Sequence, residues 1–137
     1  MVETIRTAYL GELRTEVMHV KSGYRLITDV PKERGGMGES YSPTYLFCAS
    51  LVSSILSVLG GVAKSPDFKG SIDGTIVRTT KVMNDKPEMV AEIIMEFDMP
   101  KNNFTDEQKK ILEASARNSQ VGRSVSTTMK QTLIFHY

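Results

Sequence analysis

A run without a single charged residue, from Tyr41 to Ala63, constrains the fold of this chain more than any other feature. It is as long as a membrane span of about 20 residues, but serine, threonine, proline and glycine dilute its apolar residues, and no Lys or Arg anchors its start. A helix that is apolar on all sides must be buried. We therefore expect the buried helix of a soluble protein, with Ser42 as N-cap, Pro43 at the first helical position and Gly60-Gly61 at its close.

The segments before this helix have the pattern of strands. Residues 14–20 alternate loosely, Lys21-Ser22-Gly23 has turn composition, and residues 24–30 have strand composition. These features predict an antiparallel meander, which Pro31 ends before a flexible crossing loop.

The segments after the helix predict a hairpin, a second helix and a final strand. The β-rich runs 69–80 and 89–98 flank a turn at residues 84–87. Thr105 to Gln108 form a capping box, so the second helix is expected to begin there and to run through Ala116. Residues 132–137 read as a strand, and the whole order predicts an α+β fold.

Composition bounds the organisation and the partners. A chain of 137 residues with 40% hydrophobic content has enough material for one core, so we expect a single domain over residues 1–137. The net charge of +1 gives no field that would attract nucleic acid or an anionic membrane, and we expect neither as a partner. The single cysteine, Cys48, rules out a disulfide within the chain, and the first residues do not resemble a signal peptide, so we expect a cytoplasmic protein.

Two runs of residues carry a resemblance to a known family. The first is Pro31-Lys32-Glu33-Arg34-Gly35-Gly36 followed by residues 42–54, and the second is residues 114–126, Ala-Ser-Ala-Arg-Asn-Ser-Gln-Val-Gly-Arg-Ser-Val-Ser. Both resemble the signatures of the OsmC/Ohr family, the osmotically inducible and organic hydroperoxide resistance proteins. The resemblance implies an OsmC-like fold and an intertwined homodimer, with pockets at the subunit interface between the buried helix of one chain and elements of the other.

The same resemblance implies where a peroxide-reducing centre would lie. Family members attack the peroxide with a cysteine in the buried helix and resolve the sulfenic acid with a cysteine after the second helix. Those two positions correspond here to Ser54 and Ser119. The family's acidic residue after the helix-starting proline corresponds to Thr44 or Tyr45, and its arginine from the meander to Arg14.

Serine at both positions changes the chemistry. A hydroxyl is barely ionised near neutral pH and does not cycle through sulfenic acid and disulfide, so two-cysteine peroxidase turnover is excluded. We expect a catalytically degenerate family member whose pocket binds a small apolar, thiol-bearing or phosphate-bearing molecule. The expected pocket residues are Ser50, Ser54, Ser119, Thr44, Tyr45, Arg14 and Arg123.

Two alternatives to this function stay open. In the first, the chain is a one-cysteine organic hydroperoxide reductase in which Cys48 reacts and an external thiol resolves it. Six helical positions separate Cys48 from Ser54 and place them about 120° apart around the helix, which favours a packing role for the thiol. In the second, the chain is a purely structural or interaction protein. Enzyme activity is thus an open question, with a non-enzymatic protein favoured.

Other features have both a functional and a structural interpretation. Small residues at positions 50, 54, 57 and 61 form a stripe that serves either close packing or a hydroxyl-lined pocket. The loop Arg34-Gly35-Gly36 precedes a helix, so it is either a flexible crossover or a phosphate contact for a nucleotide-tailed thiol such as coenzyme A. His19 and His136 have no triad-like or metal-ligand neighbours, so we expect neither a serine hydrolase nor a metal site, and no required cofactor.

Overall fold

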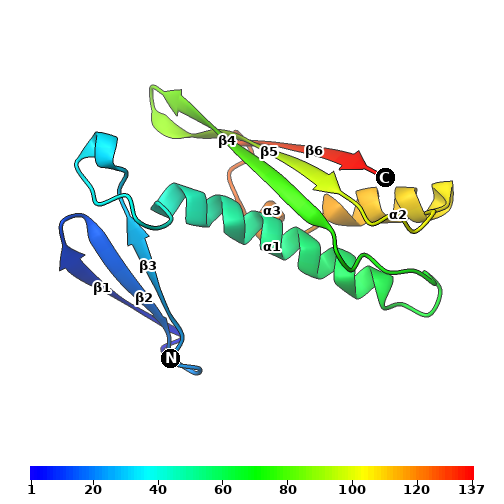
Figure 1. Ribbon diagram of the computed structural model, residues 1–137, viewed down its shortest axis with the longest axis horizontal. Coiled ribbons are helices and arrows are strands. Elements are labelled where there is room, and N and C mark those ends of the chain that lie inside the picture. The colour runs from blue at the N-terminus through cyan, green and yellow to red at the C-terminus, as the bar shows by residue number, and fades with distance from the viewer. The chain divides into compact units, whose positions relative to one another are not determined.

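The strand pattern at the start of the chain folds into a three-stranded antiparallel sheet. A computed structural model describes all 137 residues and divides them into two compact units, Met1–Phe47 and Cys48–Tyr137. The single-domain organisation stays a prediction. The first unit holds β1 (Ile5–Gly11), β2 (Arg14–His19) and β3 (Arg25–Asp29), paired in the order β1-β2-β3, and a short 3₁₀ helix, η1 (Lys32–Arg34) (Figure 1).

The predicted meander is confirmed, but its first strand, β1, was missed. The turn between β1 and β2 runs through Gly11, Glu12 and Leu13, all with positive φ. Glycine adopts this conformation at little cost, whereas glutamate and leucine rarely do so. Composition alone therefore gave no turn signal here.

The charge-free run forms α1, Pro43–Ala63. The Oγ of Ser42 accepts a hydrogen bond from the N–H of Tyr45 at 3.2 Å, which confirms the predicted N-cap. The prediction that Gly60-Gly61 closes the helix is wrong, because α1 continues through both glycines and ends shortly before Pro66. Glycine weakens a helix interior without breaking it, whereas proline cannot continue the hydrogen-bond ladder.

A second three-stranded sheet forms in the C-terminal unit. The strands β4 (Ile76–Asp85) and β5 (Glu88–Asp98) make the predicted antiparallel hairpin, and β6 (Lys130–His136) pairs with β5 in parallel. A parallel neighbour requires a long crossover. It is supplied by α2 (Asp106–Ala116) and a short third helix, α3 (Gln120–Ser124), which the sequence did not predict (Figure 1).

The core of the C-terminal unit lies between the sheet and its helices. The capping box of Thr105 and Gln108 and the end of α2 at Ala116 are as predicted. The period of two along β5 places Ile93, Met95 and Phe97 on one face of the sheet, and all three are completely buried. Side chains of this core that are completely buried are Leu51, Ile55, Leu59, Ile93, Met95, Phe97 and Leu112.

Much of α1 is not covered within the chain. Its buried residues are Cys48, Leu51, Ile55 and Leu59, which form one face. The positions of the small-residue stripe are exposed or half-buried instead. The helix is long and apolar enough to cross a membrane, and only 22% of its most apolar 18-residue stretch is buried. The core helix of a soluble protein meets the same criterion, so this property alone indicates little.

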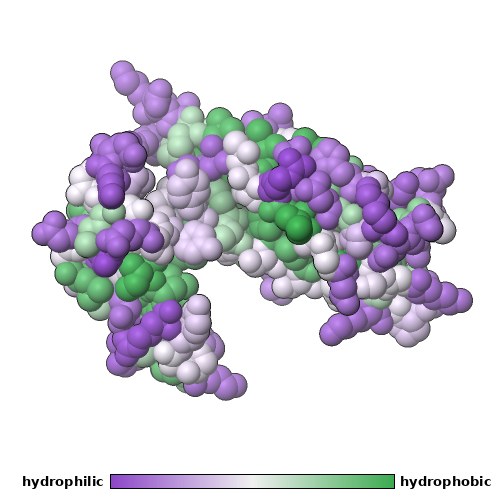
Figure 2. Space-filling model, viewed as in Figure 1, coloured by the Kyte–Doolittle hydropathy of each residue, from purple (hydrophilic) through white to green (hydrophobic).

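The sheet of the N-terminal unit also exposes apolar side chains. Every residue of β1 from Ile5 to Leu10 is exposed, and Figure 2 shows apolar residues gathered over this unit. The large exposed apolar side chains of residues 1–30 are Met1, Val2, Ile5, Tyr9, Leu10, Leu13 and Tyr24. A soluble monomer seldom exposes a large apolar patch without a partner for it.

Candidate functional site

The two candidate serines of the C-terminal unit both bind the first turn of α3. Ser119 is the N-cap of α3, and its Oγ accepts a hydrogen bond from the backbone N–H of Gly122 at 3.0 Å. Ser54 is half-buried on α1, and its Oγ accepts from the backbone N–H of Val121 at 3.3 Å. Two neighbouring amides of one short helix are thus bonded to hydroxyls from two different elements.

The surroundings of Ser119 leave it little freedom. The residue is 1% exposed. A methyl group at Gly122 would lie 2.7 Å from the Oγ of Ser119 and 3.1 Å from the Oε1 of Gln131, so only glycine fits there. From β6, the Nε2 of Gln131 donates to the carbonyl oxygen of Gly122 at 2.9 Å. These contacts hold α3 from the side of α1, from its own cap and from the sheet.

Neither serine is arranged as a nucleophile. A serine nucleophile needs an adjacent base, and both histidines have other partners: the Nδ1 of His19 lies 2.6 Å from the Oγ of Ser22, and the Nε2 of His136 lies 3.4 Å from the Oε1 of Glu96. Both candidate serines instead accept hydrogen bonds from backbone amides. The arrangement can fix α3, and it contains no group that would take the hydroxyl proton.

Cys48 lies in the buried face of α1 and is 2% exposed. Burial raises the pKa of its thiol, and the positive charge of Lys81 on β4 opposes this rise only in part. A raised pKa lowers the fraction of thiolate, which is the nucleophilic form. The thiol therefore has the character of a packed core residue.

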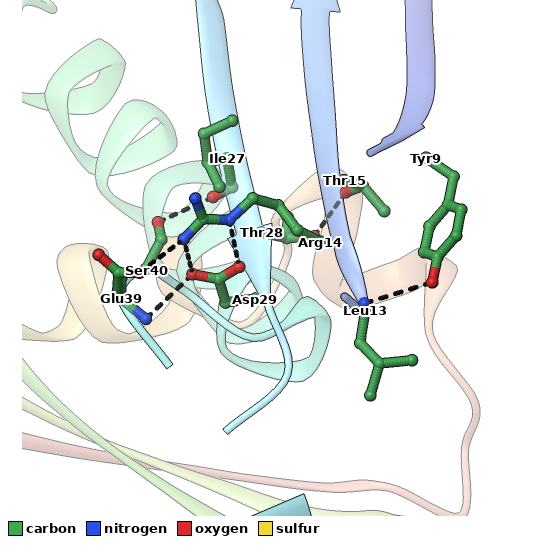
Figure 3. Close-up of polar contacts among 9 residues, drawn as sticks. All are labelled: Tyr9, Leu13, Arg14, Thr15, Ile27, Thr28, Asp29, Glu39 and Ser40. Atoms are coloured by element: carbon green, nitrogen blue, oxygen red, sulfur yellow. Dashed lines mark hydrogen bonds and ion pairs between the residues drawn. The ribbon is translucent and has the colours of Figure 1, made fainter. Parts of the chain in front are cut away.

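Arg14 of the N-terminal unit is held by two carboxylates (Figure 3). It lies directly opposite Asp29 in the β2–β3 register. Its Nε and Nη2 donate to the two oxygens of Asp29 at 2.7 and 2.8 Å, and Nη2 also contacts the Oε1 of Glu39 at 3.2 Å. The Nη1 group makes none of these contacts.

Asp29 is a buried carboxylate whose oxygens are satisfied. Its side chain has no exposed surface, and one oxygen also accepts from the backbone N–H of Glu39 at 2.9 Å. The hydrogen bonds from Arg14 lower the pKa of Asp29, against the opposing effect of burial. A buried carboxylate with three N–H donors persists as an anion. Arg14 is therefore fixed in position, with its charge balanced from within its own unit.

The glycine loop is bonded internally. The N–H groups of Gly35 and Gly36 donate to the carbonyl oxygens of Lys32 and Pro31, at 3.0 and 3.1 Å. Gly35 ends η1 in the left-handed conformation. A phosphate held by this loop would need those amides as donors. These two amides are thus bonded within the loop, and the phosphate contact at Arg34, Gly35 and Gly36 stays a prediction.

The remaining predicted pocket residues lie at several places in the fold. Thr44 and Tyr45 are in the first turn of α1, and the Oγ1 of Thr44 lies 3.2 Å from the Oγ of Ser42. Ser50 is exposed on α1. Arg123 is exposed in the last turn of α3. No group of three or more His, Cys, Asp or Glu side chains is placed to hold a metal ion.

Solved structures match nearly the whole chain. An osmotic stress induced and detoxification response protein from Psychrobacter arcticus 273-4 is 33% identical, with a TM-score of 0.93 over 99% of this chain and 97% of that one. The organic hydroperoxide resistance protein OsmC from Legionella pneumophila matches with a TM-score of 0.74 at 17% identity, over 100% and 99% of the two chains. The chain belongs to the OsmC/Ohr family.

Other OsmC/Ohr structures share the fold at lower identity. An organic hydroperoxide resistance protein from Vibrio cholerae, solved with captopril bound in one of its active sites, is 15% identical with a TM-score of 0.73, over 98% of this chain and 92% of that one. The names of these family members refer to stress response and peroxide resistance. No family model and no curated protein matches the sequence. The α+β OsmC-like fold expected from the signature residues is confirmed.

Sequence reasoning missed the partners that fix the candidate residues. The turn at residues 21–23 could have indicated the partner of Arg14. A hairpin with this turn pairs His19 with Tyr24, and the same register places Arg14 opposite Asp29. The helix α3 gave a weaker signal, a serine followed by only five helical residues. Such a short helix has no periodicity to detect.

Proposed function

We propose that this OsmC/Ohr protein has lost the two-cysteine peroxidase centre and instead binds a small apolar or thiol-bearing molecule in a pocket at a homodimer interface. The observation that carries the proposal is the pair of hydrogen bonds by which Ser54 and Ser119 hold α3. At the positions implied for the two cysteines, the chain has hydroxyl groups that act as acceptors for backbone amides.

The state of the only thiol supports the loss of peroxidase chemistry. Cys48 is buried, and burial raises its pKa, so little thiolate is present near neutral pH. This geometry disfavours the one-cysteine reductase. A purely structural protein stays as the second candidate function, and a ligand-binding experiment distinguishes it from the first.

The uncovered apolar surfaces support a dimer. A second copy would cover both the exposed side chains of β1 and the uncovered side of α1, which the single chain leaves in contact with water. Covering apolar surface stabilises an assembly by about 25 cal/mol for each Å². We therefore propose a homodimer in the cytoplasm, with the pocket at its interface.

The captopril found in the Vibrio cholerae protein supports the class of ligand. Captopril carries a thiol on a small, partly apolar frame. The phosphates of a larger thiol such as coenzyme A would need donors other than the glycine loop, whose amides are already bonded.

The proposed loss of peroxidase activity is tested by measuring the consumption of cumene hydroperoxide in the presence of a dithiol reductant. The natural chain, Cys48→Ser and the double variant Ser54→Cys/Ser119→Cys are compared at equal concentration. We expect no enzymatic rate from the first two and a gain in the double variant. Enzymatic turnover by the natural chain would refute the proposal, and its loss in Cys48→Ser would identify Cys48 as the working thiol.

The test of binding uses captopril and coenzyme A as probes. A ligand that binds only the folded protein raises the melting temperature with its concentration, as RT ln(1 + [L]/Kd). We expect captopril to raise it in the natural chain, and light scattering after size exclusion to give twice the chain mass. If neither probe shifts the melting temperature, the structural reading is favoured.

A further inference from the structure

The inward row of β6 begins with a polar residue at a position where a core favours an apolar one. Gln131 pairs with Ile93 of β5, and the next two inward positions of β6 pair with Met95 and Phe97. All three of these partners on β5 are completely buried, and Gln131 itself is half-buried. Burying a polar side chain costs free energy unless its groups are hydrogen-bonded. Core packing therefore does not account for Gln131.

The side-chain amide of Gln131 is bonded to α3 instead. Its Nε2 donates to the carbonyl oxygen of Gly122 at 2.9 Å. Its Oε1 and the Oγ of Ser119 lie 3.1 and 2.7 Å from the point that a Cβ atom at Gly122 would occupy. Side chains from β6 and from the N-cap of α3 thus meet beside one glycine, whose missing side chain permits the close approach.

The helix α3 depends on such contacts because it is short. It has five residues and buries none of them, and a helix of this length is not stable by itself. Ser54 of α1 accepts the N–H of Val121, and Gln131 of β6 donates to the carbonyl oxygen of the next residue. One side chain binds a backbone donor and the other a backbone acceptor, so α3 is restrained from two elements.

We propose that Gln131 is a positioning residue for the candidate site: through the carbonyl group of Gly122 it fixes α3, and with α3 the place of Ser119 relative to Ser54. The inference rests on the proposed function, because these two serines mark the positions implied for the family's cysteines. Ser119 is the N-cap of α3 and therefore moves with it. An apolar side chain at position 131 would leave the carbonyl group without its donor and α3 free to shift.

The reporter for this position is a disulfide in Ser54→Cys/Ser119→Cys, built on Cys48→Ser so that no other thiol is present. Glutathione disulfide is the oxidant: the two thiols lose two electrons and two protons, one S–S bond forms within the chain, and two molecules of reduced glutathione are released. The equilibrium constant of this closure is measured by alkylation and mass spectrometry. It reports how well α3 holds position 119 near position 54.

The closure constant is compared among the reporter itself, Gln131→Met and Phe135→Leu. Phe135→Leu is the matched control, because residue 135 lies in the same inward row of β6, about 13 Å along the strand from Gln131. Its ring stacks on Phe97 with centroids 4.6 Å apart, so the substitution lowers the stability of the fold through a contact that does not involve α3.

We expect Gln131→Met to lower the closure constant by about three- to tenfold, the effect of one lost hydrogen bond. Phe135→Leu should leave the constant unchanged, although it unfolds at a lower urea concentration. Equal effects of the two substitutions, no effect of Gln131→Met, or no closure in the reporter would each overturn the proposal. The assay uses neither peroxide nor captopril, so its failure is distinguishable from a failure of the proposed function.

Gln131→Glu supplies a readout that a loss of stability would not move. The carboxyl group has nearly the shape of the amide, and only its protonated form can donate to the carbonyl oxygen of Gly122. We expect the carbonyl ¹³C shift of Gly122 in this variant to match the natural chain at about pH 4 and Gln131→Met at about pH 8. In the natural chain and in Gln131→Met the shift should not change over this range. A shift that is independent of pH in Gln131→Glu would show that this hydrogen bond does not position α3.

Discussion

Removing the hydroxyl of Ser119 tests whether it holds α3. The change Ser119→Ala takes away the side-chain acceptor of the Gly122 N–H and leaves that amide without its 3.0 Å bond. Loss of a serine N-cap costs about 0.5–2 kcal/mol. Because Ser119 is 1% exposed, water does not readily replace the lost acceptor, so we expect the upper half of that range.

The assays are urea unfolding, which gives the free energy of unfolding, and thermal unfolding, which gives the melting temperature. Both are followed by circular dichroism at one fixed protein concentration, because dimerisation would change the apparent stability. For a chain of this size, about 1 kcal/mol shifts the melting temperature by roughly 3–5 °C. We therefore expect the melting temperature of Ser119→Ala to fall by about 4–8 °C. Ser54→Ala should cost less, about 0.5–1 kcal/mol, because its bond is longer and the residue is only half-buried.

The matched control is Ser57→Ala on α1. Ser57 is exposed, and its hydroxyl donates to the carbonyl oxygen of Ser53 one turn earlier, a contact that does not strengthen a helix. Alanine has the higher helix propensity, so this variant should be neutral or more stable by up to about 0.5 kcal/mol. If Ser119→Ala is no less stable than this control, Ser119 does not cap α3 and the argument fails.

Three further predictions concern the packing of α3, the buried carboxylate and the thiol. Gly122→Ala should destabilise the fold by about 1–3 kcal/mol through overpacking. The added methyl group meets the hydroxyl of Ser119 at 2.7 Å, so Ser119→Ala should cost less stability in the Gly122→Ala background than alone. If the two losses are additive in urea unfolding, there is no such clash. The folded-state pKa of Asp29 is lowered, so its stabilising effect is complete above an unfolded pKa of about 4 and is lost as pH falls through the folded value. The melting temperature of Asp29→Asn should therefore be lower than that of the natural chain at pH 7 and should fall less on acidification, whereas the exposed control Asp67→Asn should follow the natural chain. Iodoacetamide should alkylate Cys48 about 100-fold or more slowly in the folded chain than in guanidinium, because the buried thiol reacts only after local opening; equal rates would show a reactive thiol.

The elements that sequence predicted correctly are those with a local physical signature. The N-cap Ser42 ahead of Pro43, the capping box of Thr105 and the hairpin around residues 84–87 each rest on contacts within a few residues. Local chemistry is visible in sequence because the interacting groups are neighbours in the chain. The end of α1 was misplaced for the same reason, since two glycines gave a local stop signal that packing overrode.

The candidate site was predictable as residue positions but not as contacts. The family signatures placed Ser54 and Ser119, yet the role of their hydroxyls depends on α3. That helix donates an N–H to α1 and accepts a hydrogen bond from β6 at a carbonyl oxygen. Likewise, Arg14 was identified without Asp29, which binds it across the sheet. Contacts between residues distant in sequence require the fold before they can be assigned.

The double variant Ser54→Cys/Ser119→Cys connects stability with chemistry. A thiol is a weak hydrogen-bond acceptor, so the reduced variant should lose both contacts to α3 and be less stable than the natural chain by about 1–2 kcal/mol. The natural serines would then stabilise α3, whereas cysteines at these positions would provide redox chemistry. Urea unfolding of the variant, kept reduced by a dithiol, measures this difference in the free energy of unfolding.

The activity of the same variant supplies the second half of the argument. Suppose that the variant consumes hydroperoxide but is less stable than the natural chain. The fold around α3 would then still support the peroxide reduction of the family, and the serine hydroxyls would stabilise α3 while preventing that reaction. If the reduced variant is as stable as the natural chain, the hydroxyl bonds at Val121 and Gly122 contribute nothing measurable. The serines would then require an explanation other than helix capping, whatever activity the cysteines restore.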